Sequence, residues 1–485
     1  MNLKDLFDRI STEECFGYAP ASSSTKPAHI ANGWFRRLTG KAYDPVLLNN
    51  TLLHWVGSEE ANPSEKLLQD NKEVFEPFLP QNKSAQFTEF RADLRALLSP
   101  YGGAVNRGNL RSSYNATHRE HLTKDFSDNS VGAFLYHLLM TDSGQGPSPM
   151  FSLLVNILED QSDEISTLTL PLTKYAQESL VPIGSYPASS VFRQGKDGFA
   201  SPTLKRLRQG FDQLQKYESR HGGGLQALRR AVSFGVFAVM LHMVNRSCEL
   251  RKEKALTPLL LYFQGRRRTT VYHASHQTYT ICRQSIEFIY TAKFMEKIAE
   301  RIGEKPTVKQ CQRLIKDLVF AKQQEADSKR IEVEKLFAAY RDTQPLIDAL
   351  ASALTDVTFR LLKGDPTEFY RALGVRVGFL RPTGGARKYF TLDSVLLEAV
   401  LASVVSEEQI SFREFLDRLY ERYGLLTGGR AADAEILLDA GVDQVTVEDL
   451  RENAGVLRQQ LVAMGWAKAY ADGVMTVGVP AGGLL

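Results

Sequence analysis

The sequence of 485 residues contains few cysteines, and their spacing excludes two common kinds of site. Disulfide frameworks need many cysteines in a short chain, and structural zinc sites need closely spaced pairs. Here four cysteines lie far apart and form no C-x-x-C pair, which fits a reducing compartment. We therefore expect a cytoplasmic protein with free thiols at Cys15, Cys248, Cys282 and Cys311.

Long hydrophobic runs are absent as well. The longest, residues 231–244, spans about 14 residues, whereas a helix that crosses a bilayer needs roughly 20. The first residues, MNLKDLFDRISTEECFGY, place acidic side chains among apolar ones, unlike a signal peptide. We expect no membrane association, and we predict that residues 231–244 form a buried core helix.

Recognisable catalytic motifs are also missing. The glycine-rich run 384–388 lacks the spacing and the magnesium-binding hydroxyl of a phosphate loop. The sequence has no HExxH, no GxSxG and no protein-kinase set. Glu332, Glu334 and Lys335 lie in a helical stretch without the preceding strand aspartate that a metal-dependent nuclease needs. We therefore predict a protein that is not an enzyme, and we assign it no catalytic residue, metal ligand or cofactor.

What the sequence does contain is helical periodicity. Apolar residues recur at a spacing of three and four residues in several stretches between residues 86 and 363. Strand signals are limited to residues 258–263 and the C-terminal region. Segments rich in Gly, Pro and Ser suggest boundaries at 142–149 and 381–386. We predict a mainly α, multi-domain protein with minor β, divided into an N-terminal helical domain (1–145), a central helical domain (146–385) and a C-terminal domain (386–485).

The C-terminal domain has the pattern of a winged helix-turn-helix. One helix is expected to begin at Thr391, a second after the capping box of Ser411 and Glu414, and a third at Thr446. Two short strands then flank Asp472-Gly473, a pair that suits a tight hairpin turn. Three helices followed by a β-hairpin predict a winged helix.

The charge of this domain argues against direct reading of DNA. Residues 387–485 contain nine Lys/Arg and fifteen Asp/Glu, and the third helix itself carries Glu448, Asp449 and Glu452. Duplex binding depends on cations that neutralise phosphates. We therefore favour a protein-docking role, and a transcription regulator that uses the winged helix directly stays an alternative.

Positive charge is concentrated in residues 201–270. This segment has fourteen Lys/Arg and only four acidic residues. A solvated basic face that balances acidic surface elsewhere would explain this excess, but its density favours binding to nucleic acid or another polyanion. The tightest clusters are the predicted DNA contacts: Lys205, Arg206, Arg208, Arg229, Arg230, Arg266, Arg267 and Arg268.

The histidines offer one competing hypothesis. His118 and His121 are three residues apart on a stretch that we expect to be exposed, and with Glu120 or Asp125 they could share a metal. That pattern would make the protein a diverged metal-dependent nuclease, although it is too short to be specific. We expect His242, inside an apolar helix, to be a hydrogen-bonded core residue.

Two segments resemble a known group of proteins. The first is PLLLYFQGRRRTTVYHASHQTYTICRQSIEFI, and the second begins RPTGGARKYFTLDSVLLEAVLASVV. Over residues 255–300 and 380–480 the layout resembles accessory, non-ATPase subunits of bacterial anti-phage DNA restriction systems. These include the middle subunit of phosphorothioation-dependent restriction and other proteins that accompany HerA/FtsK-type ATPases.

This resemblance implies a role within an assembly. The chain would be a non-enzymatic, DNA-engaging and scaffolding subunit of a defence complex, bound to double-stranded DNA. The motor and the nuclease would reside on other chains, a HerA/FtsK-type ATPase and a nuclease. The resemblance assigns no catalytic residue to this sequence.

Overall fold

The computed structural model describes most of the chain outside the segment 44–117. The described residues are 2–20, 25–43, 118–124, 126–141, 146–160, 180–182, 188–195, 198–252, 256–265, 269–320, 323–361, 365–405, 408–471 and 473–479, with 92, 162 and 166. Three predicted DNA contacts, Arg266, Arg267 and Arg268, lie outside this part of the chain, as does Asp125.

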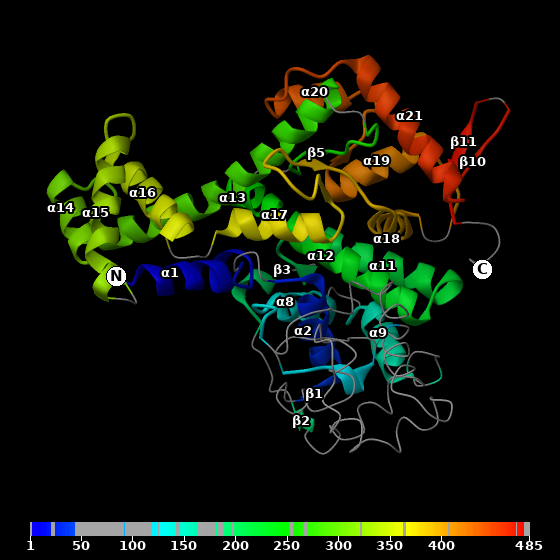
Figure 1. Ribbon diagram of the computed structural model, residues 1–485, viewed down its shortest axis with the longest axis horizontal. Coiled ribbons are helices and arrows are strands. Elements are labelled where there is room, and N and C mark those ends of the chain that lie inside the picture. Colours follow the sequence, from blue (N-terminus) through cyan, green and yellow to red (C-terminus); the bar gives the residue numbers. More distant parts are fainter. Residues whose placement is uncertain are drawn as a thin grey trace.

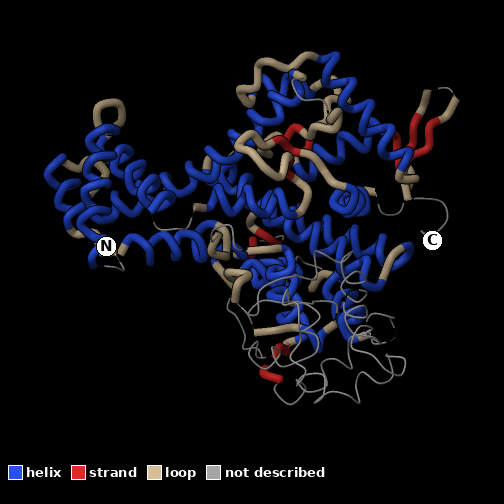
Figure 2. Tube along the Cα trace, in the orientation of Figure 1, coloured by secondary structure: helices blue, strands red, loops and turns tan. Residues whose placement is uncertain are grey.

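The described residues are mainly helical, as the periodicity predicts (Figures 1 and 2). Two helices, α11 (Pro202–His221) and α12 (Gly224–Leu250), form an antiparallel hairpin against which several other helices pack. Ser201, which precedes α11, donates a hydrogen bond to Glu249 at the end of α12. Gly222 and Gly223 join the two helices and form the turn of the hairpin. Ser201 and Glu249 lie at the other, open end.

Helix α12 lies in the core because it is apolar on every side. Every residue from 231 to 244 is buried, which confirms the predicted core helix. The whole helix is long and apolar enough to cross a bilayer, but 89% of its most apolar window is buried by the rest of the fold. This burial is typical of the central helix of a soluble protein.

The N-terminal residues pack on one side of the hairpin. Where α2 (Pro27–Thr39) crosses α8 (Val131–Met140), a Cβ on Gly132 would come within 2.3 Å of the Gly33 backbone, so only glycine permits the approach. Arg36 and Asp128 form a buried ion pair of 2.9 Å beside this crossing. The elements are α1 (Leu3–Arg9), the π-helix η1 (Ile10–Cys15), α2 (Pro27–Thr39), α8 (Val131–Met140) and α9 (Pro149–Glu159), with β1 (Lys41–Tyr43) paired to β2 (Leu180–Pro182).

A long helix, α13 (Thr270–Ile302), leads from the hairpin to a separate group of helices (Figure 1). Its second half packs against α16, and α15 packs on α16 in turn. Helix α1 also contacts α16, so the N-terminus lies beside this group. The group comprises α14 (Val308–Lys316), α15 (Gln323–Tyr340) and α16 (Leu346–Leu361), and α17 (Pro366–Arg376) leads the chain back to the hairpin.

The C-terminal residues form three main helices and small sheets. Ser411 accepts a hydrogen bond from the Glu414 N–H, but the Glu414 carboxylate pairs with Arg418, so only half of the predicted capping box forms. The elements are β6 (Leu380–Arg381), β7 (Tyr389–Phe390), α18 (Ser394–Val404), β8 (Ile410–Ser411), α19 (Phe412–Tyr423), β9 (Leu425–Leu426), α20 (Asp433–Asp439), α21 (Val447–Ala463), β10 (Ala467–Ala469) and β11 (Met475–Val477). Strands β10, β11 and β8 form one antiparallel sheet in that order.

Contacts join these C-terminal elements closely to the centre of the molecule. Helix α18 packs on both α11 and α12. Strand β9 runs parallel to β5 (Leu259–Leu260), a short strand from the middle of the chain. The buried side chain of Asn453 on α21 donates to the Leu261 and Thr427 carbonyls and accepts from the Phe263 N–H. One face of α21 is therefore covered by the rest of the chain.

Candidate anion-binding site

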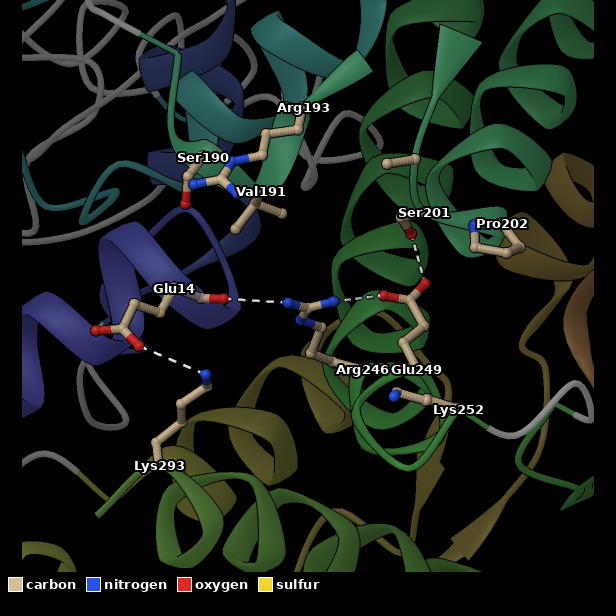
Figure 3. A pocket seen from close by; sticks show the side chains of 11 residues that line it. Glu14, Ser190, Val191, Arg193, Ser201, Pro202, Arg246, Glu249, Lys252 and Lys293 are labelled. Carbon is tan, nitrogen blue, oxygen red and sulfur yellow. Dashed lines mark hydrogen bonds and ion pairs between the residues drawn. The ribbon is translucent and has the colours of Figure 1, made fainter. Parts of the chain in front are cut away.

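A cavity of about 660 Å³ lies where α11 begins and α12 ends (Figure 3). Five segments build it: η1, the short helix η6 (Ser190–Phe192) with the chain that follows it, the start of α11, the end of α12 and the middle of α13. We call this the basic cavity, and its lining residues are Glu14, Ser190, Val191, Arg193, Ala200, Ser201, Pro202, Arg246, Glu249, Lys252 and Lys293.

The start of α11 fixes one wall of the basic cavity. Ser201 is the N-cap of α11 and accepts from the Leu204 N–H at 3.1 Å, with Pro202 at the first helical position. The Ser201 hydroxyl also donates to the Glu249 carboxylate at 2.5 Å. The start of α11 and the end of α12 therefore lie at the same edge of the basic cavity.

Arg246 joins the two sides of the cavity. Its guanidinium donates to the Glu249 carboxylate at 2.8 Å and to the Glu14 backbone carbonyl at 3.2 Å (Figure 3). Burial alone would raise the pKa of Glu249, but His242, Ser201 and Arg246 together lower it below its ordinary value. Glu249 is therefore ionised at neutral pH and holds Arg246 in position.

His242 lies in the core beside this pair, as predicted. Burial lowers the pKa of His242 to about 4, while Glu249 partly opposes that shift. Its ring stacks on Phe134, with the ring centres 4.9 Å apart. Backbone groups of Phe16 and Cys15 near the ring also oppose the lowering of its pKa. The imidazole is therefore neutral at pH 7 and adds no charge to the cavity.

The basic cavity has an excess of positive charge. Its lining includes four cationic side chains and two carboxylates, Glu14 and Glu249. Lys293 pairs with Glu14 at 3.5 Å and with Glu296 at 2.7 Å. Arg193 and Lys252 are exposed, and within the described part of the chain their side chains have no ion pair or hydrogen bond. These two cations leave the cavity suited to an anion such as phosphate.

The structure removes Arg208 from the predicted DNA contacts. Its side chain is buried, and its guanidinium donates to the Leu138, Leu139, Thr141 and Gly146 carbonyls at 2.9–3.2 Å. These carbonyls lie at and after the end of α8, where a helix leaves its last carbonyls without partners. For Arg208 the prediction is wrong, because the cation serves as a helix cap inside the fold.

Arg230 is the second correction. It is 4% exposed and donates to both carboxylate oxygens of Glu218, at 2.6 and 2.8 Å, and to Glu398 at 3.1 Å. Burial opposes its charge, but the hydrogen bonds and charge of Glu218 raise the pKa of Arg230 above its ordinary value. This guanidinium joins α11, α12 and α18 and is not available to DNA.

The other predicted contacts that the structure describes are not fully buried, but they do not gather in one place. Lys205 is exposed, and Arg206 and Arg229 are half-buried. Lys205 lies one turn into α11, whereas Arg229 is on the second turn of α12, near the hairpin turn. The hairpin therefore separates clusters that the sequence alone presents as one basic region.

Sequence reasoning missed much of the cavity wall. Arg246 and Lys252 belong to the basic segment 201–270 but were not among the chosen clusters, and Arg193 and Lys293 lie outside it. The available signal was the pair Ser201-Pro202, which marks a helix start. Nothing in the sequence indicates which distant cations lie beside that start.

The structure contradicts one premise of the histidine hypothesis, the exposure of the pair, whereas Asp125 lies outside the described residues. His118 and His121 are fully buried, not exposed as predicted, and burial, then the charge of His118, lowers the pKa of His121 to about 3. The His118 Nδ1 accepts from the Glu120 N–H, and Glu120 pairs with Arg119 at 3.1 Å. Within the described residues no group of three His, Cys, Asp or Glu side chains could hold a metal.

Comparisons of the chain with protein-family models, with curated proteins and with solved structures find no match. The resemblance to restriction subunits is therefore supported only by the sequence segments 255–300 and 380–480.

Proposed function

We propose that the chain is a non-enzymatic, DNA-engaging and scaffolding subunit of a multi-protein DNA-targeting defence complex. The observation that supports it best is the basic cavity, where Arg193 and Lys252 are exposed and make no ion pair or hydrogen bond with any described residue. Phosphate contacts by such cations hold duplex DNA without reading its sequence. The motor and the nuclease are then chains of other proteins, an ATPase of the HerA/FtsK type and a nuclease, and the complex acts in the cytoplasm.

We further infer that the C-terminal elements form a winged helix that docks a protein. The order α18, β8, α19, α21, β10, β11 and the sheet order β10-β11-β8 support this fold. Three apolar side chains, Val462 in the last turn of α21 and Tyr470 and Val474 on the hairpin, are 42–51% exposed. Exposed apolar groups favour a protein partner over a polyanion. Direct DNA reading by α21 is less favoured, because its uncovered face carries Glu448 and Glu452.

A charge-reversal experiment tests the DNA contact. The double variant Arg193→Glu/Lys252→Glu should bind a duplex oligonucleotide more weakly and lower the salt slope of binding by about 1 for each phosphate that is no longer neutralised. Fluorescence anisotropy at several salt concentrations measures both quantities. The matched control is Lys305→Glu/Lys309→Glu, which reverses two exposed charges that do not line the cavity.

Three results of this experiment would contradict the proposed role of the basic cavity or of the chain. Equally weakened binding in the two double variants would mean that net charge alone sets the affinity, and the basic cavity would have no special role. No binding of the wild-type protein at low salt, alone or with its partner subunits, would reject the proposal. Metal-dependent DNA cleavage by the purified chain would favour the nuclease hypothesis instead.

A further inference from the structure

A second cavity, of about 640 Å³, lies between the start of α13 and the loop that joins β6 to β7. It shares no residue with the basic cavity. Its walls are the half-buried rings of Tyr272 and Tyr389 on one side and the largely exposed loop 382–387 on the other. We call it the tyrosine cavity, and its lining residues are Tyr272, Pro382, Thr383, Gly384, Gly385, Ala386, Arg387 and Tyr389.

The loop is held in shape by a buried ammonium group. Lys388 is fully buried, and its Nζ donates to the Pro382, Thr383 and Gly384 carbonyls at 2.5–3.2 Å. Burial, then the nearby Arg371, lowers the pKa of Lys388 from its ordinary value. Since these carbonyls face the ammonium, the loop does not need a ligand to order it.

The backbone N–H groups of the same loop are available as hydrogen-bond donors. Within the described residues the backbone N–H groups from Thr383 to Arg387 have no hydrogen-bond acceptor. Arg387 is exposed, and its side chain has no ion pair or hydrogen bond there either. A run of backbone N–H groups beside a guanidinium is suited to the oxygens of a phosphate.

The opposite wall is a rigid aromatic surface. The rings of Tyr272 and Tyr389 pack edge to face, with centres 5.3 Å apart, and both pack on the buried ring of Tyr262 at 5.7 and 5.2 Å. The loop leaves them uncovered because its middle residues are small. A Cβ added at Gly384 would meet no atom of the described residues within 4 Å.

We propose that the tyrosine cavity binds an unpaired nucleotide, with the base against the tyrosines and its phosphate at Arg387 and the loop. Aromatic side chains bind any base through its face, and a cation holds the phosphate beside it. In a duplex both faces of a base are covered by its neighbours, so this site selects single-stranded ends or gaps. The inference rests on the proposed function only in taking nucleic acid as the ligand. It adds a preference for unpaired bases over duplex DNA, which phosphate contacts in the basic cavity cannot provide.

The test compares oligonucleotides that differ in one respect. A short single strand of thymidines is measured against the same strand with abasic residues, which keeps every phosphate and removes the bases. We expect the wild-type full-length protein to bind the strand with bases about tenfold more tightly, in line with typical stacking effects. Tyr272→Leu, which keeps an apolar side chain without an aromatic face, should abolish most of that difference. Gly384→Leu should do the same by filling the cavity.

Controls distinguish this proposal from the previous one. Lys309→Ala, an exposed change on α14, should keep the preference for bases, and thermal unfolding checks that each variant is folded. If Arg193→Glu/Lys252→Glu weakens duplex binding but keeps the preference for bases, both proposals hold. An equal affinity of the wild type for intact and abasic strands overturns the tyrosine cavity, whatever the duplex result. So does an unchanged preference in both Tyr272→Leu and Gly384→Leu.

A competition arm identifies the source of the nucleotide. Displacement of the labelled strand by thymidine monophosphate would assign the site to a free nucleotide as well as to a strand. Displacement only by oligonucleotides would assign it to a strand. Either result supports binding of a base with its phosphate.

Discussion

Arg208 and Arg193 carry the same charged group on either side of one helix start, but their surroundings are opposite. Arg208 is buried, with four backbone carbonyls and Asp212 as partners. Arg193 is exposed at the basic cavity, and no described residue pairs with its side chain. The difference teaches that the density of charge in a sequence does not measure the charge that a ligand meets. Buried arginines stabilise the fold, and only the uncompensated ones are available for binding.

The largest effect should come from Arg230, because its main partner is a fully buried carboxylate. Arg230→Met leaves the fully buried carboxylate of Glu218 without its partner, and we expect the free energy of unfolding to fall by about 3–5 kcal/mol. Urea denaturation measures it. Adding Glu218→Gln should recover part of this stability, since the unpaired charge is then removed. A decrease below about 1 kcal/mol would show that the pair is not enclosed.

Arg208→Met should cost about 2–3 kcal/mol, because several carbonyls around the end of α8 are then without a charged donor. The affinity of the folded variant for DNA should not change. Denaturation and anisotropy on the same preparation check both statements. Weaker DNA binding at full stability would show that Arg208 contacts DNA, and would contradict the distinction between buried Arg208 and exposed Arg193.

The neutral histidine beside the cavity predicts a pH dependence. The unfolded chain protonates His242 near its ordinary pKa of 6.5, but the folded chain does so only near 4. The unfolded state therefore gains protons first as the pH falls through this window. We expect His242 to remove about 2 kcal/mol of stability between pH 8 and pH 5. In His242→Phe the stability should fall less over the same range, and an unchanged slope would contradict the assignment.

The smallest effect should come from an exposed cation. Lys205→Ala should change the free energy of unfolding by less than about 0.5 kcal/mol, because the side chain is solvated. It should still weaken duplex binding severalfold and lower the salt slope by about 1. Lys309→Ala, with a similar exposure on α14, is the control and should change neither quantity.

Local features of the fold could be predicted from the sequence. The core helix 231–244 follows from its apolar composition, and the starts of α19 and α21 follow from the caps Ser411 and Thr446. These features depend on neighbours along the chain. The side-chain half of the capping box at Glu414 did not form, because Arg418 offers a closer charge one turn later.

The candidate site depends on distant contacts, and there the sequence was a poor guide. No local pattern indicates that Arg208 meets the carbonyls after α8 or that Arg230 meets Glu398 on α18. His118 and His121 looked exposed because their neighbours are polar, but the fold encloses both rings. The basic cavity takes residues from five segments, so its charge is known only once they are assembled.

Helix α13 connects the two cavities and fixes their separation. Tyr272 lies in its first turn and Lys293 in its second half, 21 residues later, which is roughly 30 Å along the axis. Twenty-one residues make about 5.8 helical turns, so the two side chains leave the helix about 60° apart around its axis. A stacked strand advances about 3.4 Å per nucleotide. A strand that occupies both ends must therefore be about nine nucleotides long, so affinity plotted against oligonucleotide length should rise in a step near that value.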